Sequence, residues 1–155
     1  MKALTVQQPW AWSIVHGGKL IENRTQLWSY RGPLAIHAGA RWSERGGESE
    51  LVRNAWDCVT AQCGPATYSQ LSTAWVARGA IIGVVELVDC HPDAGCCAPW
   101  GESAYVEHSG RERRRITHLV LENPRPLAEP IPCKGALGLW NPPADVLAEL
   151  KAVGS

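Results

Sequence analysis

The nearly continuous apolar run at residues 79–88 most constrains how this chain can fold. Its side chains are largely β-branched, and Glu86 is the one charge among them. Such a run is typical of a strand buried on both faces, so it predicts the central strand of a sheet. Shorter alternating or apolar stretches predict further strands at residues 2–6, 20–25, 34–38, 115–122 and 135–140.

Apolar residues at helical spacing predict helices between these strands. The segments are 9–16, 48–62, 70–77 and a last helix after Asn141-Pro142. A proline-rich turn is predicted at 124–132, and an irregular excursion at 89–111. The absence of a regular βαβ alternation favours an α+β fold, a mixed β-barrel of about six strands decorated by helices. We expect residues 1–155 to form a single domain.

Composition narrows the classes of function. Hydrophobic residues make up 45% of the chain and charged residues 19%, which is typical of a globular protein. The formal net charge is zero, so no global field draws the protein towards nucleic acid. The sequence has no apolar run of about 18 residues that would cross a membrane, and its first residues turn polar too soon for a signal peptide. We therefore expect a cytoplasmic protein with no membrane partner.

Residues 8–24 concentrate polar chemistry beside a sharp turn. Pro9 begins a short helix, Gly17-Gly18 ends it, and Lys19, Glu22 and Arg24 follow in a Gly-x-Lys-x-x-Glu-x-Arg spacing. A strand period of two places Glu22 and Arg24 on one face. Lys19 can project over a cleft to hold a phosphate, or act as a base if burial lowers its pKa. The alternatives are a solvated lysine and a structural Glu22–Arg24 ion pair.

Aromatic and basic residues extend this candidate site. Trp10 or Trp12 offers a face on which a base can stack, and the apolar stripe of the helix indicates that Trp12 is the more exposed. Tyr30 and Arg31 lie at a turn that we expect to be nearby. Arg113 and Arg114 belong to the one basic run, 111–115, which can follow a phosphate backbone or simply be solvated.

Six cysteines raise the question of a metal or a disulfide. Cys90-His91 with Cys96-Cys97 is the one cluster, but its spacing matches no common zinc pattern. We interpret the cysteines as reduced thiols that pack as small hydrophobic side chains. The sequence predicts no metal site and no cofactor.

Three segments together resemble the ASCH domain. They are Gln8-Pro9-Trp10-Ala11 with the Lys19, Glu22 and Arg24 spacing, then the segment 30–38 (Tyr-Arg-Gly-Pro-Leu-Ala-Ile-His-Ala), and the closing segment 130–140. ASCH is a β-barrel related to the PUA domain, here of a small bacterial or phage type. The resemblance implies that RNA or a nucleotide binds in a cleft between the first helix and the barrel.

The resemblance also implies an enzymatic alternative. Some small members are N4-acetylcytidine amidohydrolases or a ribonuclease, and in the amidohydrolases a lysine matching Lys19 is catalytic. Those enzymes have threonine three residues later, where this chain has Glu22, and a distant glutamate, for which Glu102 and Glu107 are candidates.

We therefore expect a module that binds RNA, DNA or a modified nucleotide. The expected binding residues are Trp10, Trp12, Lys19, Glu22, Arg24, Tyr30, Arg31, Arg113 and Arg114. The alternatives are a small hydrolase with Lys19 as base and Glu22 assisting, and a protein-interaction domain without a ligand.

Overall fold

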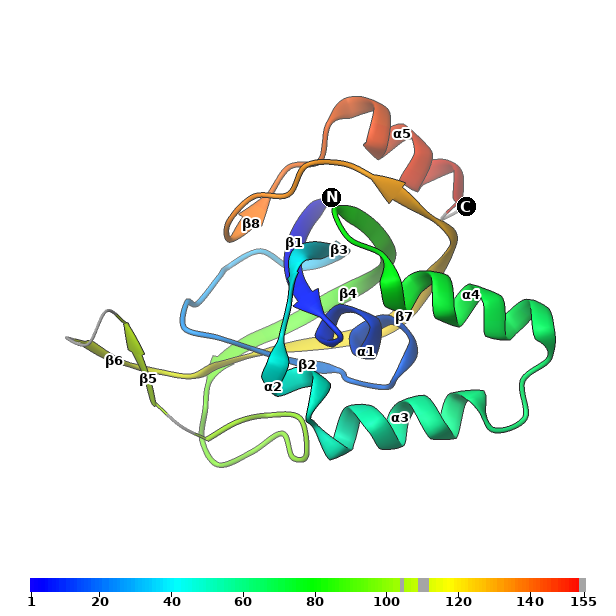
Figure 1. Cartoon of the computed structure of the whole chain (residues 1–155). Helices are drawn as coiled ribbons and strands as arrows, with labels where there is room; N and C mark the ends of the chain where they lie inside the picture. Colours follow the sequence, from blue (N-terminus) through cyan, green and yellow to red (C-terminus); the bar gives the residue numbers. More distant parts are fainter. Residues whose placement is uncertain (104, 109–111, 154–155) are drawn as a thin grey trace.

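A computed structural model describes residues 1–103, 105–108 and 112–153, the segments 105–108 and 112–114 as backbone only. Six strands form one curled sheet in the order β2-β7-β4-β3-β1-β8 (Figure 1). The strands are β1 (Lys2–Gln8), β2 (Ile21–Arg24), β3 (Gly32–Trp42), β4 (Ala80–Pro92), β7 (Thr117–Pro132) and β8 (Leu139–Trp140). A separate two-stranded sheet joins β5 (Tyr105–His108) and β6 (Glu112–Arg115).

The apolar run seen in the sequence is an interior strand, as predicted. Strand β4 pairs antiparallel with β3 on one side and with β7 on the other. Strands β1 and β3 pair in parallel, so the sheet is mixed. The predicted α+β fold, a mixed β-barrel of about six strands decorated by helices, is confirmed, and its six strands form a curled sheet that makes half a barrel.

Strand β7 continues through the segment where a proline-rich turn was predicted, so that prediction was wrong. Pro126 pairs with Gly83, and Pro132 pairs with Ala80 at the start of β4. The register between the two strands shifts several times, and Asn123 adopts a left-handed φ of 49°. These irregularities let the strand keep its pairing despite prolines that cannot donate a ladder hydrogen bond.

Five helices accompany the sheet in the described residues: α1 (Trp10–His16), α2 (Glu44–Gly47), α3 (Glu50–Thr60), α4 (Pro65–Val76) and α5 (Ala144–Val153). Helix α4 begins five residues before the predicted start, because Pro65 takes the first helical position, where its fixed φ and missing N–H are tolerated. The short helix α2 was not predicted. Its N-cap, Ser43, accepts a hydrogen bond from the Gly46 amide.

Two apolar cores lie on the two faces of the sheet. On one face α1 packs on β4, and a Cβ added at Gly83 would come within 2.6 Å of Val15 Cγ1, so the glycine leaves room for the helix. On the other face Val146 and Leu150 of α5 pack against Ile81 and Ile131. The sheet is therefore covered by helix on both sides, and α1 is held tightly enough to position the residues that follow it.

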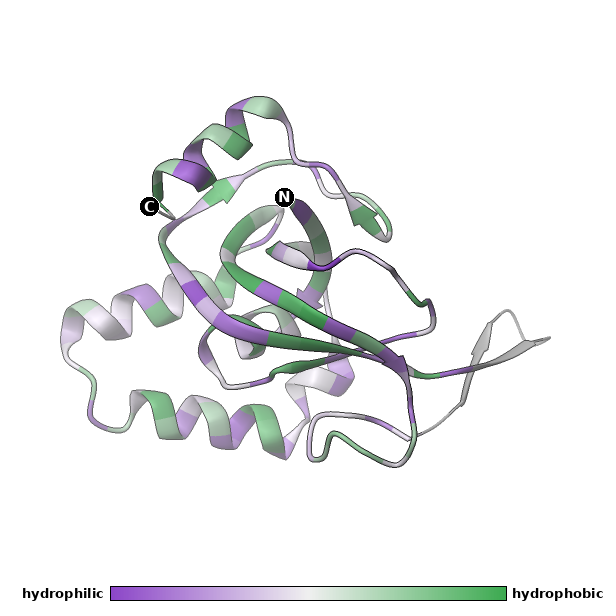
Figure 2. Cartoon of the chain, turned by 180° about the vertical axis from the view of Figure 1, so that it is seen from behind, coloured by the Kyte–Doolittle hydropathy of each residue, from purple (hydrophilic) through white to green (hydrophobic). Residues whose placement is uncertain are grey.

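An aromatic cluster joins α1 to α3 and α4. The Trp12 ring lies 5.2 Å from both the Trp56 and the Trp75 rings, and the Trp56 and Trp75 rings lie 4.9 Å apart. The indole N–H of Trp12 donates to the Leu71 carbonyl at 3.1 Å. Helix α3 carries both hydrophobic and hydrophilic residues, as an amphipathic helix does (Figure 2). Trp12 is 0% exposed, so the prediction that it is the more exposed of the two tryptophans was wrong.

Across the described residues, the structure contains no helix that is both long and apolar enough to traverse a bilayer.

Candidate functional site

A cavity of about 640 Å³ lies beside α1, where β1, β2, the start of α3 and two loops meet. Both aromatic and charged side chains line it. The lining includes Thr5, Trp10, Lys19, Glu22, Asn23, Arg24, Arg45, Trp100, Glu102 and Leu137. Leu137 is 98% exposed at the rim, so it offers apolar surface to anything that enters.

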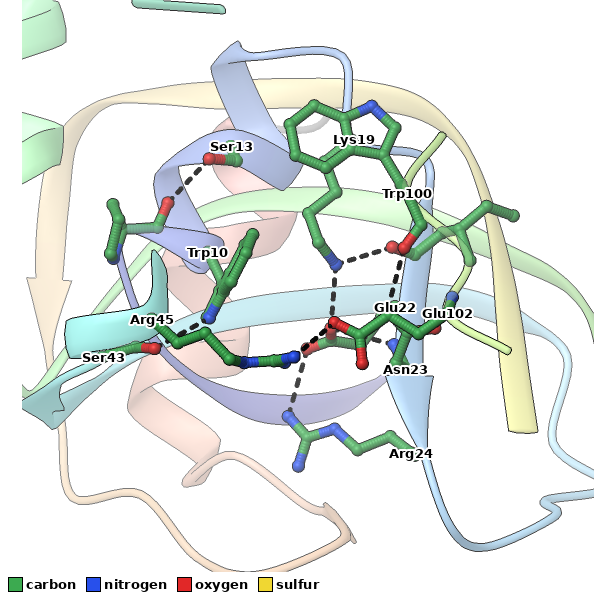
Figure 3. Close-up of polar contacts among 12 residues, drawn as sticks. Trp10, Ser13, Lys19, Glu22, Asn23, Arg24, Ser43, Arg45, Trp100 and Glu102 are labelled. Atoms are coloured by element: carbon green, nitrogen blue, oxygen red, sulfur yellow. Dashed lines mark hydrogen bonds and ion pairs between the residues drawn. The ribbon is translucent and has the colours of Figure 1, made fainter. Parts of the chain in front are cut away.

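Lys19 lies at the wall of this cavity and is almost completely buried. Gly18 adopts a left-handed φ of 75°, which turns the chain back so that the Lys19 amide donates to the Ser13 carbonyl at 3.0 Å. The Lys19 ammonium donates to the Ile21 carbonyl at 2.6 Å and to Glu22 Oε1 at 2.9 Å (Figure 3). Only 2% of Lys19 is exposed, so the alternative of a solvated lysine is wrong. One of its three N–H groups remains for a ligand.

Glu22 is the centre of a chain of charges. Its Oε1 accepts from Lys19 and from the Asn23 amide at 3.0 Å, and its Oε2 lies 3.3 Å from Arg24 Nη2. Burial alone would raise the pKa of Glu22, but the charges of Lys19 and Arg24 and these hydrogen bonds outweigh burial and hold the pKa below its usual value. The carboxyl is therefore ionised at neutral pH.

Arg24 and Trp10 border the same cavity. The Arg24 Nη2 also donates to the Thr5 carbonyl at 2.8 Å, which fixes the guanidinium against β1. The Trp10 ring lies 5.6 Å from the Lys19 ammonium, and its indole N–H donates to Ser43 Oγ at 3.0 Å. The ring is held in place at its edge while part of its surface stays exposed.

Asn23 attaches a loop to the cavity. Its Nδ2 donates to the Trp100 carbonyl at 2.9 Å, and its Oδ1 accepts from the Glu102 amide at 2.9 Å (Figure 3). Glu102 in turn pairs with Arg45 at 2.8 Å, and the Arg45 guanidinium lies 5.8 Å from the Trp10 ring. Asn23, Arg45 and Trp100 were not among the predicted site residues. For Trp100, the only signal was a tryptophan within a long excursion.

The structure brings together four predicted residues and separates three others. Trp10, Lys19, Glu22 and Arg24 line the cavity, as does the candidate glutamate Glu102. The remaining predicted residues with described side chains, Trp12, Tyr30 and Arg31, are absent from the lining.

Each of the separated residues has other contacts. Trp12 is in the aromatic cluster. The Tyr30 hydroxyl donates to the Pro33 carbonyl, and Arg31 contacts the Trp28 carbonyl and pairs with Asp89 at 3.5 Å. The side chains of Arg113, Arg114 and Glu107 lie outside the described residues.

A second polar cluster joins the loop that carries Trp100 to strands β4 and β7. His91, Cys96 and Cys97 approach one another together with His118, each offering one ligand atom within 4.8 Å of the others. Cys90 is buried elsewhere and contacts the Gln26 carbonyl and the Trp28 amide, because successive strand residues point to opposite faces.

The curled six-stranded sheet, with a polar cavity beside its first helix, is a PUA-like α+β fold. The sequence matches the ASCH domain over residues 4–130, so the chain belongs to the ASCH domain family. That family is generally associated with RNA binding in a PUA-like fold. The resembling segment 131–140 lies beyond the matched residues.

Solved structures agree with this assignment of the fold. The chain is similar to the ASCH protein of Zymomonas mobilis, with 13% identity, a TM-score of 0.55, and 98% of this chain and 94% of that chain covered. A mutant form of the same Zymomonas mobilis protein gives 13% identity, a TM-score of 0.56, and coverage of 98% and 96%. Comparison with curated proteins gives no match.

Proposed function

We propose that this protein binds single-stranded RNA or a modified nucleotide by taking one nucleotide into the cavity beside α1. The observation that carries this proposal is a chain of charges in the wall of a cavity that also presents Trp10 and Trp100: buried Lys19 and Glu22, with partly exposed Arg24. The structural similarity covers 98% of the chain, which supports residues 1–155 as one ASCH domain.

The size and lining of the cavity suit a nucleotide. Small-molecule sites typically enclose roughly 300–1,000 Å³ with apolar walls and a few placed polar groups, and this cavity has about 640 Å³. The rings of Trp10 and Trp100 offer surfaces on which a base can stack whatever its sequence. A sizeable cavity beside Lys19 also supports a ligand-binding role over a protein-interaction domain that has no ligand.

Local charge, rather than net charge, would attract the phosphate. Three cations and two carboxylates line the cavity, so its wall is positive although the whole chain is neutral. Glu22 holds both Lys19 and Arg24 in fixed positions, so each cation meets an anion without first losing conformational freedom. Asn23 and Glu22 offer the amide and carboxylate groups that recognise base edges.

The same geometry gives less support to a hydrolase. Lys19 already donates to Glu22 and to the Ile21 carbonyl, so as it stands it is a hydrogen-bond donor rather than a proton acceptor. The threonine of the related amidohydrolases is replaced by a carboxylate that holds this lysine. Glu102, the candidate distant glutamate, does line the cavity, but it is paired with Arg45.

Binding of fluorescent single-stranded RNA oligomers, measured by anisotropy, tests the proposal, with DNA of the same sequence and free nucleotides as competitors. Trp10→Ala should weaken binding roughly 5- to 150-fold, the loss expected for one stacked base. The logarithm of the association constant, plotted against the logarithm of the salt concentration, should have a shallow slope of about −1.4 for two phosphate contacts on a single strand.

A matched pair of variants separates the cavity from general charge effects. Arg24→Ala removes an arginine that is paired with Glu22 beside the cavity. Arg125→Ala removes an arginine that is paired with Glu86 at a distance of 2.8 Å, and neither of these two residues lines the cavity. We expect Arg24→Ala to weaken binding and Arg125→Ala to leave it unchanged. If RNA, DNA and nucleotides all fail to bind at low salt, or if both variants bind equally, the proposal is wrong. Turnover of RNA or of N4-acetylcytidine that is lost in Lys19→Ala would favour the hydrolase instead.

A further inference from the structure

Four potential metal ligands converge beside the sheet. His91 at the end of β4 and His118 in β7 lie directly opposite each other in the strand pairing, and Cys96 and Cys97 come from the loop after β4. Cys96 Sγ lies 3.7 Å from His118 Nδ1, Cys97 Sγ lies 3.6 Å from His91 Nε2, and the two sulfurs lie 3.5 Å apart. Each ligand atom is within 4.8 Å of the other three.

The histidine rings present lone pairs to the sulfurs. His91 Nδ1 lies 2.8 Å from the Pro92 carbonyl, and His118 Nε2 lies 2.9 Å from the Glu102 carbonyl. A carbonyl oxygen only accepts hydrogen bonds, so each of these ring nitrogens carries the proton. In the neutral rings, His91 Nε2 and His118 Nδ1 are then free to ligate. Histidines that bind metals usually donate their other N–H to a carbonyl or carboxylate in this way.

The spacing of the ligand atoms fits a tetrahedral zinc ion. Zinc–sulfur bonds of roughly 2.3 Å and zinc–nitrogen bonds of roughly 2.0–2.1 Å place two sulfurs roughly 3.8 Å apart, and a sulfur and a nitrogen roughly 3.6 Å apart. Three of the six separations in this cluster, 3.5, 3.6 and 3.7 Å, lie close to these values, and the other three are within 4.8 Å. Two thiolates and two imidazoles are a donor set that selects Zn²⁺.

The backbone supplies an independent observation. Cys97 has a φ of 66°, a left-handed conformation that a residue with a side chain adopts at a cost. That conformation directs two adjacent cysteine side chains towards the same point, although the spacing of adjacent cysteines matches no common zinc motif. A bond from each sulfur to one metal ion would compensate for the strain.

We propose that His91, Cys96, Cys97 and His118 bind one Zn²⁺ ion in a closed structural site. All four positions are protein ligands, so no coordination position remains for a substrate. The ion would attach the loop of residues 93–103 to β4 and β7. This departs from the expectation that the cysteines are reduced thiols and that the chain has no metal site.

The site has a consequence for the cavity, and this part of the inference rests on the proposed function. The loop that carries Cys96 and Cys97 also carries Trp100 and Glu102, which line the cavity. Asn23 and His118, which pair across β2 and β7, both hydrogen-bond to this loop. Zinc would therefore fix one wall of the nucleotide site without touching the nucleotide.

Metal analysis of tag-free protein, purified under reducing conditions and supplied with Zn²⁺, tests the site. We expect about one zinc per chain in the wild type and in the control Cys133→Ser, and almost none in the double variant Cys96→Ser/Cys97→Ser. Cys133 lies outside the cluster. Equal zinc content in wild type and double variant would overturn the proposal, whether both hold none or both hold adventitious metal.

Cobalt substitution keeps the test decisive if the double variant does not fold. Wild-type protein loaded with Co²⁺ should show the intense visible bands of a tetrahedral site and a thiolate-to-cobalt charge-transfer band in the near ultraviolet. Weak octahedral bands, or a Cys96–Cys97 disulfide that persists under reducing conditions and excludes cobalt, would overturn the proposal.

Measuring RNA affinity with and without a chelator then tests the link to the cavity separately. If zinc binds but the chelator leaves the RNA affinity unchanged, the metal site stands and its influence on the cavity is rejected. Failure of RNA to bind under any condition would count against the proposed function and leave the metal result standing.

Discussion

Trp10 and Trp12 lie two residues apart on α1 and have opposite surroundings. Trp12 is completely buried among Trp56 and Trp75, whereas Trp10 borders the cavity with part of its ring exposed. Residues two apart on a helix point in directions about 200° apart, so one cannot share the environment of the other. The short helix α1 thus has one face that stabilises the fold and another that is free to contact a ligand.

The two regions on either side of α1 also differ in energetics. The aromatic cluster excludes water from large apolar surfaces, which is directly stabilising. Within the Lys19–Glu22–Arg24 chain, the Lys19–Glu22 pair is removed from water, and a buried ion pair is often no more stable than an apolar replacement of similar volume. The aromatic side is explained by stability alone, whereas the charged side is not, which agrees with the ligand-binding role proposed for it.

Trp12→Ala should have the largest effect on stability. Loss of a completely buried tryptophan should lower the free energy of unfolding by roughly 3–5 kcal/mol, because the helices cannot close the space that is left. Trp10→Ala removes a partly exposed ring and should cost clearly less. Urea denaturation of both variants gives the comparison, and equal losses would contradict the division of α1 into two faces.

Glu22→Gln should come next, with a loss of roughly 3 kcal/mol. The amide keeps the size of the side chain but leaves the buried Lys19 without its compensating charge. Glu86→Gln is the matched control, since Glu86 pairs with Arg125 at a half-exposed position and should cost less than about 1 kcal/mol. Denaturant midpoints for the two variants that agree within error would show that the Glu22 network is not coupled to the fold.

His16 should give the smallest effect and a distinctive dependence on pH. Burial lowers its pKa from 6.5 to about 4, and within the described structure its Nε2 has no hydrogen-bond partner. Between these values the unfolded chain binds a proton that the folded chain does not, so stability falls as pH falls from 6.5 to 4.

Thermal melting at pH 7 and pH 5 measures this slope. His16→Gln should reduce the loss of stability at pH 5 by about 1 kcal/mol, an amount kept small because the group is partly exposed. The lowered pKa of Glu22 acts in a lower window, below its usual value of 4.5, and does not interfere. An unchanged slope in the variant would show that other groups cause it.

Local patterns predicted what depends on local geometry. The apolar run around Val84 predicted an interior strand, and the period of two predicted that Glu22 and Arg24 share a face. Helical spacing placed Trp10 and Trp12 on different faces but assigned the buried face wrongly. The choice is made by α3 and α4, which are distant in sequence.

Contacts between distant segments could not be predicted in this way. Asn23 meets the Trp100 carbonyl 77 residues further along the chain, and no periodicity in either segment encodes that meeting. His118 becomes a potential ligand only because β7 pairs with β4 opposite His91. Both facts depend on the register of strands that the sequence alone left open.

The pairing of β1 with β8 determines when the cavity can form. The Trp140 indole donates to Thr5 Oγ1 at 3.1 Å across a separation of 135 residues, and Thr5 also holds Arg24 through its carbonyl. Ala136, Leu137 and Gly138, just before β8, complete the rim of the cavity. During synthesis, nearly all of the described chain must be made before β8, the second strand that pairs with β1, is present. The cavity is therefore completed late, and a growing chain that still lacks β8 has a cavity with an incomplete rim.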